Sequence, residues 1–268
     1  MPVTVGIAAA HAAGQVVWWR GALALAVSVS VQVGTNYAND YSDGVRGTDA
    51  VRVGPTRLVA SGLAPPAAVR RAAVASFGIA GACGLVLALA TSLWVIPVGA
   101  ACVAAGWFYT GGPRPYGYVG LGELFVFAFF GMVAVVGTAY VAEGRVFALA
   151  FAAAVPVGLA AVALLVVNNL RDIPTDAASG KKTLAVRLGA GRTRWFYASC
   201  LLAAVLSTAL AAVRRPWAAI ALVAAVVAIR PVRRVLSGAE GRDLVPVLGM
   251  TALFQLVLGT LLTVGLAV

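Results

Sequence analysis

Residues 146–176 read VFALAFAAAVPVGLAAVALLVVNNLRDIPTD. The part from 146 to 170 carries no charged residue, and it is longer than the roughly 20 apolar residues that a helix needs to cross a hydrocarbon core of about 30 Å. The run ends in a polar cluster that contains Asn168, Asp172 and Asp176. This stretch therefore predicts a transmembrane helix with carboxylates at one membrane face.

Seven further stretches lack charged residues, and together with 146–170 they predict nine transmembrane helices. The stretch 72–113 has 42 residues, about twice the length of one crossing. We expect it to turn back at Thr91-Ser92-Leu93. The stretches 2–19 and 216–229 are short for a full crossing. The seven stretches are 2–19, 21–39, 72–113, 124–142, 195–213, 216–229 and 244–268.

The overall composition agrees with this membrane assignment. Hydrophobic residues make up 62% of the chain and charged residues 11%, and the mean hydropathy is +0.95. These values lie far outside the range of soluble globular domains. The sequence predicts an all-α integral membrane protein.

The net charge of +11 raises the question of nucleic-acid binding. The basic residues, however, lie in the connections between the predicted helices. The connections after the second, fourth, sixth and eighth helices contain 16 of the 20 Lys and Arg residues. Because positive charge collects in cytoplasmic loops, this asymmetry predicts a cytoplasmic N-terminus and argues against a nucleic-acid partner.

Several common site chemistries are not suggested by the sequence. Cys83, Cys102 and Cys200 lie singly within apolar stretches, so neither a disulfide framework nor a zinc site is expected. His11 is the one histidine of the chain, which makes histidine-based catalysis improbable. The first apolar stretch has no basic segment before it, so a cleavable signal peptide is not expected.

A second polar cluster resembles the one at 168–176. Residues 36–43 read NYANDYSD and are followed by Asp49, and the two clusters hold five of the nine acidic residues. Asn39 and Asp43 recur as Asn168 and Asp172 at a constant offset of 129 residues. A helix places residues i and i+4 on one face. Carboxylate and amide oxygens suit hard divalent cations, so the clusters predict two facing metal sites in a single bundle.

Three functions compete for these clusters. In a purely structural role, the Asn and Asp residues would cap helix ends or pair with arginines such as Arg171, although a cap needs one such residue and not a repeated set. An ion-coupled transporter would place its acids near the middle of the bilayer, whereas these lie at helix ends. A Mg²⁺-dependent enzyme acting on a lipid diphosphate also explains the nearby basic residues, which include Arg52 and Lys181.

The motifs resemble those of the membrane-embedded aromatic prenyltransferases, the superfamily named after the 4-hydroxybenzoate polyprenyltransferases. The resemblance is closest to its 1,4-dihydroxy-2-naphthoate polyprenyltransferase branch in menaquinone biosynthesis. It covers nearly the whole chain, although the polar, basic lead-in usual in the family is missing before the first helix. The segments that carry it are Asn39–Asp43 with Gly47 and Asp49, Tyr109–Pro113 with Gly120–Glu123, and Asn168–Asp172 through Gly189.

The resemblance implies a fold, a reaction and a cofactor. The fold would be one transmembrane domain over residues 1–268, with nine helices around a central cavity and a cytosolic cap in the plasma membrane. The reaction would transfer a polyprenyl group from its diphosphate to 1,4-dihydroxy-2-naphthoate with decarboxylation, giving a demethylmenaquinone. Mg²⁺ would be the cofactor. Other aromatic acceptors, such as 4-hydroxybenzoate, share the acidic clusters and stay open.

The resemblance also implies roles for individual residues. Asp43, Asp172 and Lys181 would be catalytic. Lys181 and Arg52 would contact the diphosphate, Tyr109 or Arg114 would line the acceptor side, and Asn36 and Asp40 would assist substrate binding. One Mg²⁺ would be held by Asn39, Asp43 and Asp49, and the other by Asn168, Asp172 and Asp176.

Overall fold

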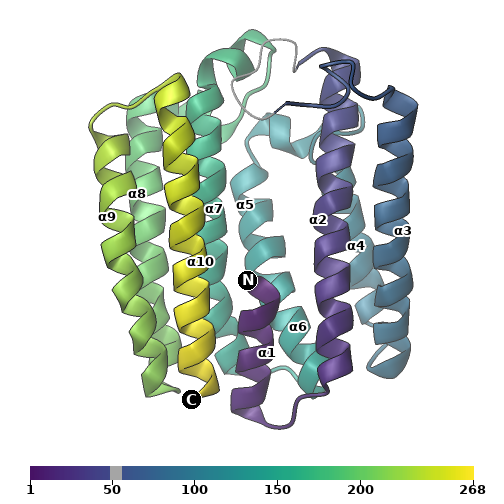
Figure 1. Ribbon diagram of the computed structural model, residues 1–268, viewed down its shortest axis with the longest axis vertical. Helices are drawn as coiled ribbons and strands as arrows, with labels where there is room; N and C mark the ends of the chain where they lie inside the picture. The colour runs from purple at the N-terminus through teal and green to yellow at the C-terminus, as the bar shows by residue number, and fades with distance from the viewer. Residues whose placement is uncertain (49–55) are drawn as a thin grey trace. The chain divides into compact units, whose positions relative to one another are not determined.

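The computed structural model describes residues 1–48 and 56–268, and within these ranges the regular structure is helical (Figure 1). The expected all-α fold is confirmed. The chain forms two compact units. Unit 1 comprises residues 1–21, 123–171 and 188–268, and unit 2 comprises residues 22–122 and 172–187. That the whole chain acts as one prenyltransferase domain stays a prediction.

Nine helical segments occupy the described residues, as the sequence predicts. The expected turn at 91–93 lies between the end of one helix at Ala90 and the start of the next at Val95. The segments are α1 (Pro2–Ala13), α2 (Trp18–Arg46), α3 (Pro66–Ala90), α4 (Val95–Phe108), the continuous run of α5 (Gly122–Val126), η2 (Phe127–Val133) and α6 (Ala134–Glu143), then α7 (Ala148–Ala178), α8 (Leu184–Ala212), η3 (Pro216–Val223) continuing as α9 (Ala224–Leu236), and α10 (Val245–Ala267) preceded by η4 (Gly241–Leu244).

The helices differ in their ability to cross a membrane alone. Five helical runs in the described residues are long and apolar enough: Pro66–Ala90, Gly122–Glu143, Ala148–Ala178, Leu184–Ala212 and Gly241–Ala267. The helices α1 and α4 are apolar but have 12 and 14 residues. At 1.5 Å per residue they extend only about 18 and 21 Å. Their place in the membrane therefore depends on packing against longer helices.

Within unit 1, α1 is held by small residues and by two arginines. Ala10 of α1 packs with Ala139, Ala142 and Ala150, and α1 also packs against α10. The last carbonyl groups of a helix lack partners within it. Two of them accept hydrogen bonds here: Arg145 Nη2 donates to Ala13 O at 2.8 Å, and Arg215 Nη2 donates to Ala12 O. Both arginines lie in the connections that the charge asymmetry assigns to the outer face.

Within unit 2, α2, α3 and α4 share an apolar core. Ala38, Ala73 and Phe77 are buried together, and Figure 1 shows the three helices running along one another. Gly34 and Gly106 let α2 and α4 approach Phe77, because a Cβ at either position would lie 2.9 or 3.3 Å from its ring. This core fixes the end of α2 that carries the first acidic cluster.

The segment η2 is a π-helix, a feature that the sequence does not predict. Gly131 in η2 lies against Gly158 in α7, and a Cβ added at Gly131 would lie 2.6 Å from Gly158 Cα. The absence of side chains at this crossing lets the two helix backbones come close, which is a common means of helix association in membranes.

This crossing yields a stability prediction. We expect Gly131→Ala to lower the free energy of unfolding by about 1–3 kcal/mol, because the new methyl group overlaps backbone atoms that cannot rotate away. The control is Gly137→Ala in α6, where a Cβ meets no atom within 4 Å. Thermal unfolding in detergent measures both. Equal midpoints for the two variants would contradict the tight crossing.

Candidate functional site

The first acidic cluster lies in the last turns of α2. Asn39, Asp40 and Asp43 are all buried there, with exposed fractions of 9%, 5% and 5%. Asn36 is exposed, one turn earlier. Asp49 and Arg52 lie outside the described residues, so their predicted roles stay predictions. The helical i,i+4 arrangement of Asn39 and Asp43 is confirmed.

Asp40 holds the chain that follows the cluster. Its Oδ2 accepts a hydrogen bond from the Leu58 N–H at 2.9 Å, and its Oδ1 accepts one from the Val59 N–H at 3.0 Å. Gly44 leaves room for this segment, because a Cβ there would lie 2.5 Å from Val59 Cγ1. Both carboxylate oxygens of Asp40 thus anchor a turn. Its predicted contact with substrate stays a prediction, and this placement favours a structural role.

Asp43 is the meeting point of the polar network in unit 2. Tyr118 Oη donates to Asp43 Oδ1 at 2.5 Å. Lys181 Nζ lies 3.4 Å from Asp43 Oδ2 and 4.0 Å from Asp176 Oδ1. The ammonium also lies 4.7 Å from the centre of the Tyr118 ring, within the range of a cation–π interaction. One cation therefore links the first acidic cluster to the end of the second.

The pKa of the Tyr118 phenol is raised above its ordinary value. Burial is the larger cause, and the nearby carboxylate of Asp43 raises the pKa further. A raised pKa means that the phenol keeps its proton at higher pH than a free tyrosine does. Tyr118 therefore remains a hydrogen-bond donor to Asp43 throughout the physiological range.

A glycine-rich loop positions Tyr118. Thr110 Oγ1 donates to Asn39 Oδ1 at 2.8 Å, and the Arg46 guanidinium donates to the carbonyl oxygens of Thr110 and Gly112. The Lys182 N–H donates to Tyr118 O at 2.8 Å. The loop is thus attached both to the end of α2 and to the segment after α7.

The Gly and Pro content of residues 109–118 predicts a loop without helix, which is correct except at its end. Residues Tyr116–Val119 form one 3₁₀ turn, called η1, that closes on Gly120 with a φ of 80°. A left-handed φ of this kind favours glycine, which has no Cβ. Tyr109, half-buried, packs edge-on against Tyr116 at 5.4 Å between ring centres, and Arg114 is exposed.

The second cluster begins within α7, in unit 1. Arg171, 3% exposed, donates from Nη2 to Asn168 Oδ1 at 2.9 Å. Asn169 Nδ2 donates to Glu123 Oε1 at 3.0 Å, and both of these residues are buried. Asn168 thus has an arginine as a neighbour, as the spacing of three residues on one helix allows.

The second cluster continues in unit 2. Asp172 and Asp176 are both half-buried and lie one turn apart on α7. The helix ends at Ala178, before Gly180, whose φ is 76°. The turn after α7 brings Lys181 back to Asp176 and to Asp43. Lys181 therefore lies beside acids of both clusters, and its predicted contact with the diphosphate stays a prediction.

The donors have the chemistry that Mg²⁺ requires, since carboxylate and amide oxygens predominate. Among the residues that the structure describes, no three His, Cys, Asp or Glu side chains are close enough to hold a metal ion together. Asp49, the third predicted ligand of the first set, lies outside those residues. Between Asp43 and Asp176, the positive charge in this structure comes from Lys181.

The sequence assigns no individual site role to four residues that make these contacts: Tyr118, Thr110, Arg46 and Asn169. Tyr118 and Asp43 are 75 residues apart, and no local pattern indicates their contact. The glycines that flank Tyr118 signal a tight turn, but they do not indicate which acid the tyrosine meets.

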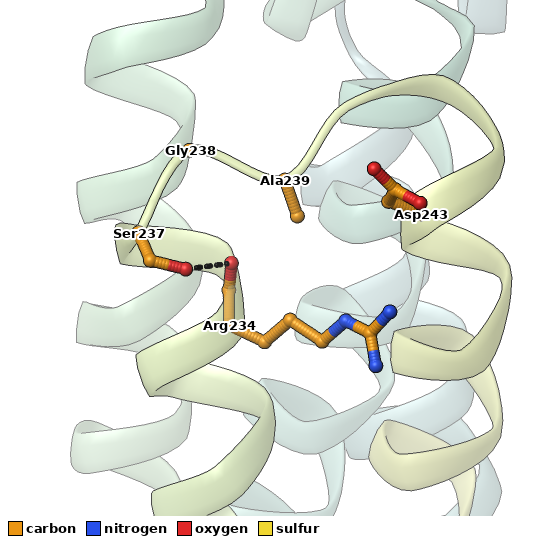
Figure 2. A pocket seen from close by; sticks show the side chains of 5 residues that line it. All are labelled: Arg234, Ser237, Gly238, Ala239 and Asp243. Atoms are coloured by element: carbon orange, nitrogen blue, oxygen red, sulfur yellow. Dashed lines mark hydrogen bonds between the residues drawn. The ribbon is translucent and has the colours of Figure 1, made fainter.

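A separate pocket of about 340 Å³ lies at the connection between α9 and α10 (Figure 2). Ser237 Oγ donates to Arg234 O there at 3.0 Å. None of the predicted site residues lines this pocket. Its lining residues are Arg234, Ser237, Gly238, Ala239 and Asp243.

Solved structures share this fold. A UbiA homologue from Aeropyrum pernix K1, in its apo form, matches with a TM-score of 0.78 and 16% identity over 98% of this chain and 95% of its own. A UbiA homologue from Archaeoglobus fulgidus, bound to DMAPP and Mg²⁺, matches with a TM-score of 0.61 and 15% identity over 98% and 95%. These low identities establish the likeness of fold.

Sequence relatives are much closer. A 1,4-dihydroxy-2-naphthoate octaprenyltransferase of Mycobacterium tuberculosis is 52% identical over 96% of this chain and 88% of its own. The enzyme of the same name from Escherichia coli is 34% identical over 92% and 84%. The family model for UbiA prenyltransferases matches residues 1–250. The chain is an integral membrane protein that belongs to the UbiA prenyltransferase family.

Proposed function

We propose that this protein transfers a polyprenyl group from its diphosphate to 1,4-dihydroxy-2-naphthoate, with loss of the acceptor's carboxylate, to give a demethylmenaquinone. The names of the relatives that are 52% and 34% identical support this acceptor. The position of Lys181 carries the proposal on the structural side, because the ammonium lies within 4.0 Å of carboxylates from both acidic clusters.

The arrangement suits a diphosphate because it joins carboxylates to a mobile cation. A lysine is a flexible point charge that can exchange a carboxylate for a phosphate oxygen. When a diphosphate enters, Lys181 would leave Asp43 and Asp176 and contact the phosphate oxygens. Each of the two carboxylates would then be available to a metal ion. Arg52, for which we propose a further diphosphate contact, lies outside the described residues.

Asn39, Asp43 and Asp49 would hold one Mg²⁺, and Asn168, Asp172 and Asp176 the other. The homologues from Archaeoglobus fulgidus bind Mg²⁺ together with DMAPP or GPP, which supports this cofactor. When bound, Mg²⁺ would compensate the charge that develops on the departing diphosphate. Thr110 and Arg171 would orient the two asparagine amides through the hydrogen bonds described above.

The chain's own residues would prepare the reaction by positioning. Tyr118 fixes one oxygen of Asp43 and stays protonated, so the carboxylate keeps one orientation. Arg46 and Thr110 hold the loop that carries Tyr118. The electron-rich hydroquinone ring would attack the allylic carbon as its bond to the diphosphate breaks. Loss of carbon dioxide would make the substitution irreversible.

We place the protein in the plasma membrane with this site on the cytoplasmic side. The charge asymmetry supports this orientation. Two contacts support this orientation as well: Arg46 binds the 109–118 loop, and Lys181 lies beside Asp43. Both contacts join connections that the distribution of Lys and Arg assigns to the cytoplasmic face.

The acidic clusters yield the first prediction of function. We expect Asp43→Asn and Asp172→Asn each to lower the rate of prenyl transfer by about 100-fold or more, because the loss of a metal-binding carboxylate costs several kcal/mol of charge stabilisation. Product formation at saturating Mg²⁺ measures the effect. Asp243→Asn, outside both clusters, is the control. Near-normal turnover in either cluster variant would refute the two-cluster mechanism.

The acceptor yields a second prediction. The purified protein should prenylate 1,4-dihydroxy-2-naphthoate and strongly prefer it to 4-hydroxybenzoate. Mass spectrometry with an acceptor labelled at its carboxyl carbon should show a product without the label. A product that retains the label would exclude decarboxylation, and efficient use of 4-hydroxybenzoate would assign a different acceptor.

The orientation yields a third prediction. In a variant without Cys83, Cys102 and Cys200, a cysteine at Ser179 or Ser237 should resist an impermeant thiol reagent added to intact cells. A cysteine at Leu93, in the connection between α3 and α4, should react and serves as the control. Labelling at Ser179 from outside would reverse the proposed orientation.

A further inference from the structure

Glu123 is a buried carboxylate with an unused oxygen. The side chain lies in the first turn of the span Gly122–Glu143, and the residue is 6% exposed. Its Oε1 accepts the hydrogen bond from Asn169 Nδ2 at 3.0 Å. Its Oε2 is buried and has no hydrogen-bond partner among the described residues.

Such an oxygen is costly in a folded protein. A buried acceptor that gains no hydrogen bond loses the free energy of its hydration without compensation, and unsatisfied groups of this kind are few in native structures. Glu143, at the far end of the span, forms an ion pair with Arg145 through Oε1 at 2.6 Å, and its Oε2 likewise has no hydrogen-bond partner among the described residues. Glu143 therefore has a cation beside it, whereas the side-chain partner of Glu123 is the neutral amide of Asn169.

The reactants of the proposed function differ in whether they can donate a hydrogen bond to Glu123 Oε2. A diphosphate and the acceptor's own carboxylate are anions, and a carboxylate repels them. A polyprenyl chain has no polar hydrogen. The hydroxyl groups of the aromatic acceptor are the hydrogen-bond donors that remain. The 1-hydroxyl lies beside the acceptor's carboxylate and bonds to it internally, so the 4-hydroxyl is the free donor.

We propose that Glu123 Oε2 binds the 4-hydroxyl of the aromatic acceptor, and that Asn169 holds the Glu123 side chain for this purpose. Glu123 is then a specificity residue for a hydroquinone, and Asn169 is a positioning residue. This inference rests on the proposed function. Asn169 belongs to α7, the helix that also carries Asp172, so the helix would present both substrate-binding groups and metal-binding groups.

The test compares two ligands that differ by one hydroxyl. Dissociation constants of 1,4-dihydroxy-2-naphthoate and of 1-hydroxy-2-naphthoate are measured anaerobically without polyprenyl diphosphate, so that no turnover occurs. We expect the wild-type protein to bind the dihydroxy compound about 10- to 100-fold more tightly, as a hydrogen bond to a buried carboxylate allows.

Glu123→Leu should abolish this preference by weakening the dihydroxy ligand alone. Glu123→Gln should retain part of it, because an amide oxygen is a weaker acceptor than a carboxylate. Glu143→Gln, the same change at the other end of the span, should leave the preference intact. The Michaelis constant for polyprenyl diphosphate should be similar in all variants. If Glu123→Leu unfolds in detergent, Glu123→Gln serves as the test.

An unchanged preference in the Glu123 variants would overturn the inference. So would an equal loss of affinity for both ligands, which would mean that Glu123 acts on the part of the acceptor that both ligands share and not on the 4-hydroxyl. Neither result bears on the proposed function, which fails instead if the wild-type protein forms no prenylated naphthoate product.

Discussion

The charge of Asp43 must be compensated at the end of a helix whose surroundings are largely apolar, and much of unit 2 is organised around this requirement. Tyr118 and Lys181 take its two oxygens. Tyr118 comes from the loop after α4, and Lys181 comes from the turn after α7. A buried carboxylate without such partners would be strongly destabilising. The same requirement therefore joins three distant parts of the chain and gathers the groups that a diphosphate would need.

The helices could be predicted from the sequence because their causes are local. Charge-free length marks the spans, and the excess length of 72–113 reveals the turn at 91–93 that the structure places between α3 and α4. The i,i+4 spacing of Asn39 and Asp43 depends only on helix geometry. The sequence predicts neither the π-helical geometry of η2 nor the crossing of Gly131 with Gly158, because no local pattern marks the first and the two glycines are 27 positions apart.

The candidate site was predictable in its residue types but not in its contacts. Asp43 and Lys181 stand out in the sequence because charges are rare in it, whereas Tyr118 and Thr110 look like ordinary loop residues. Asp40 shows that membership of a cluster does not fix the contacts of an acid. It lies in the same cluster as Asp43, yet both of its oxygens bind the backbone at Leu58 and Val59. Only the tertiary structure separates the acid that anchors a turn from the acid that faces Lys181.

The attachment of α1 has a consequence for biosynthesis. The 12 residues of α1 are too few to span a bilayer, and the two arginines that bind its terminal carbonyl groups follow 132 and 203 residues after those carbonyls. A ribosome adds about 5–20 residues per second, so α1 waits roughly 10 seconds or more for Arg215. Stable insertion of α1 is therefore a late event of assembly, because it requires the parts of unit 1 that carry Arg145 and Arg215.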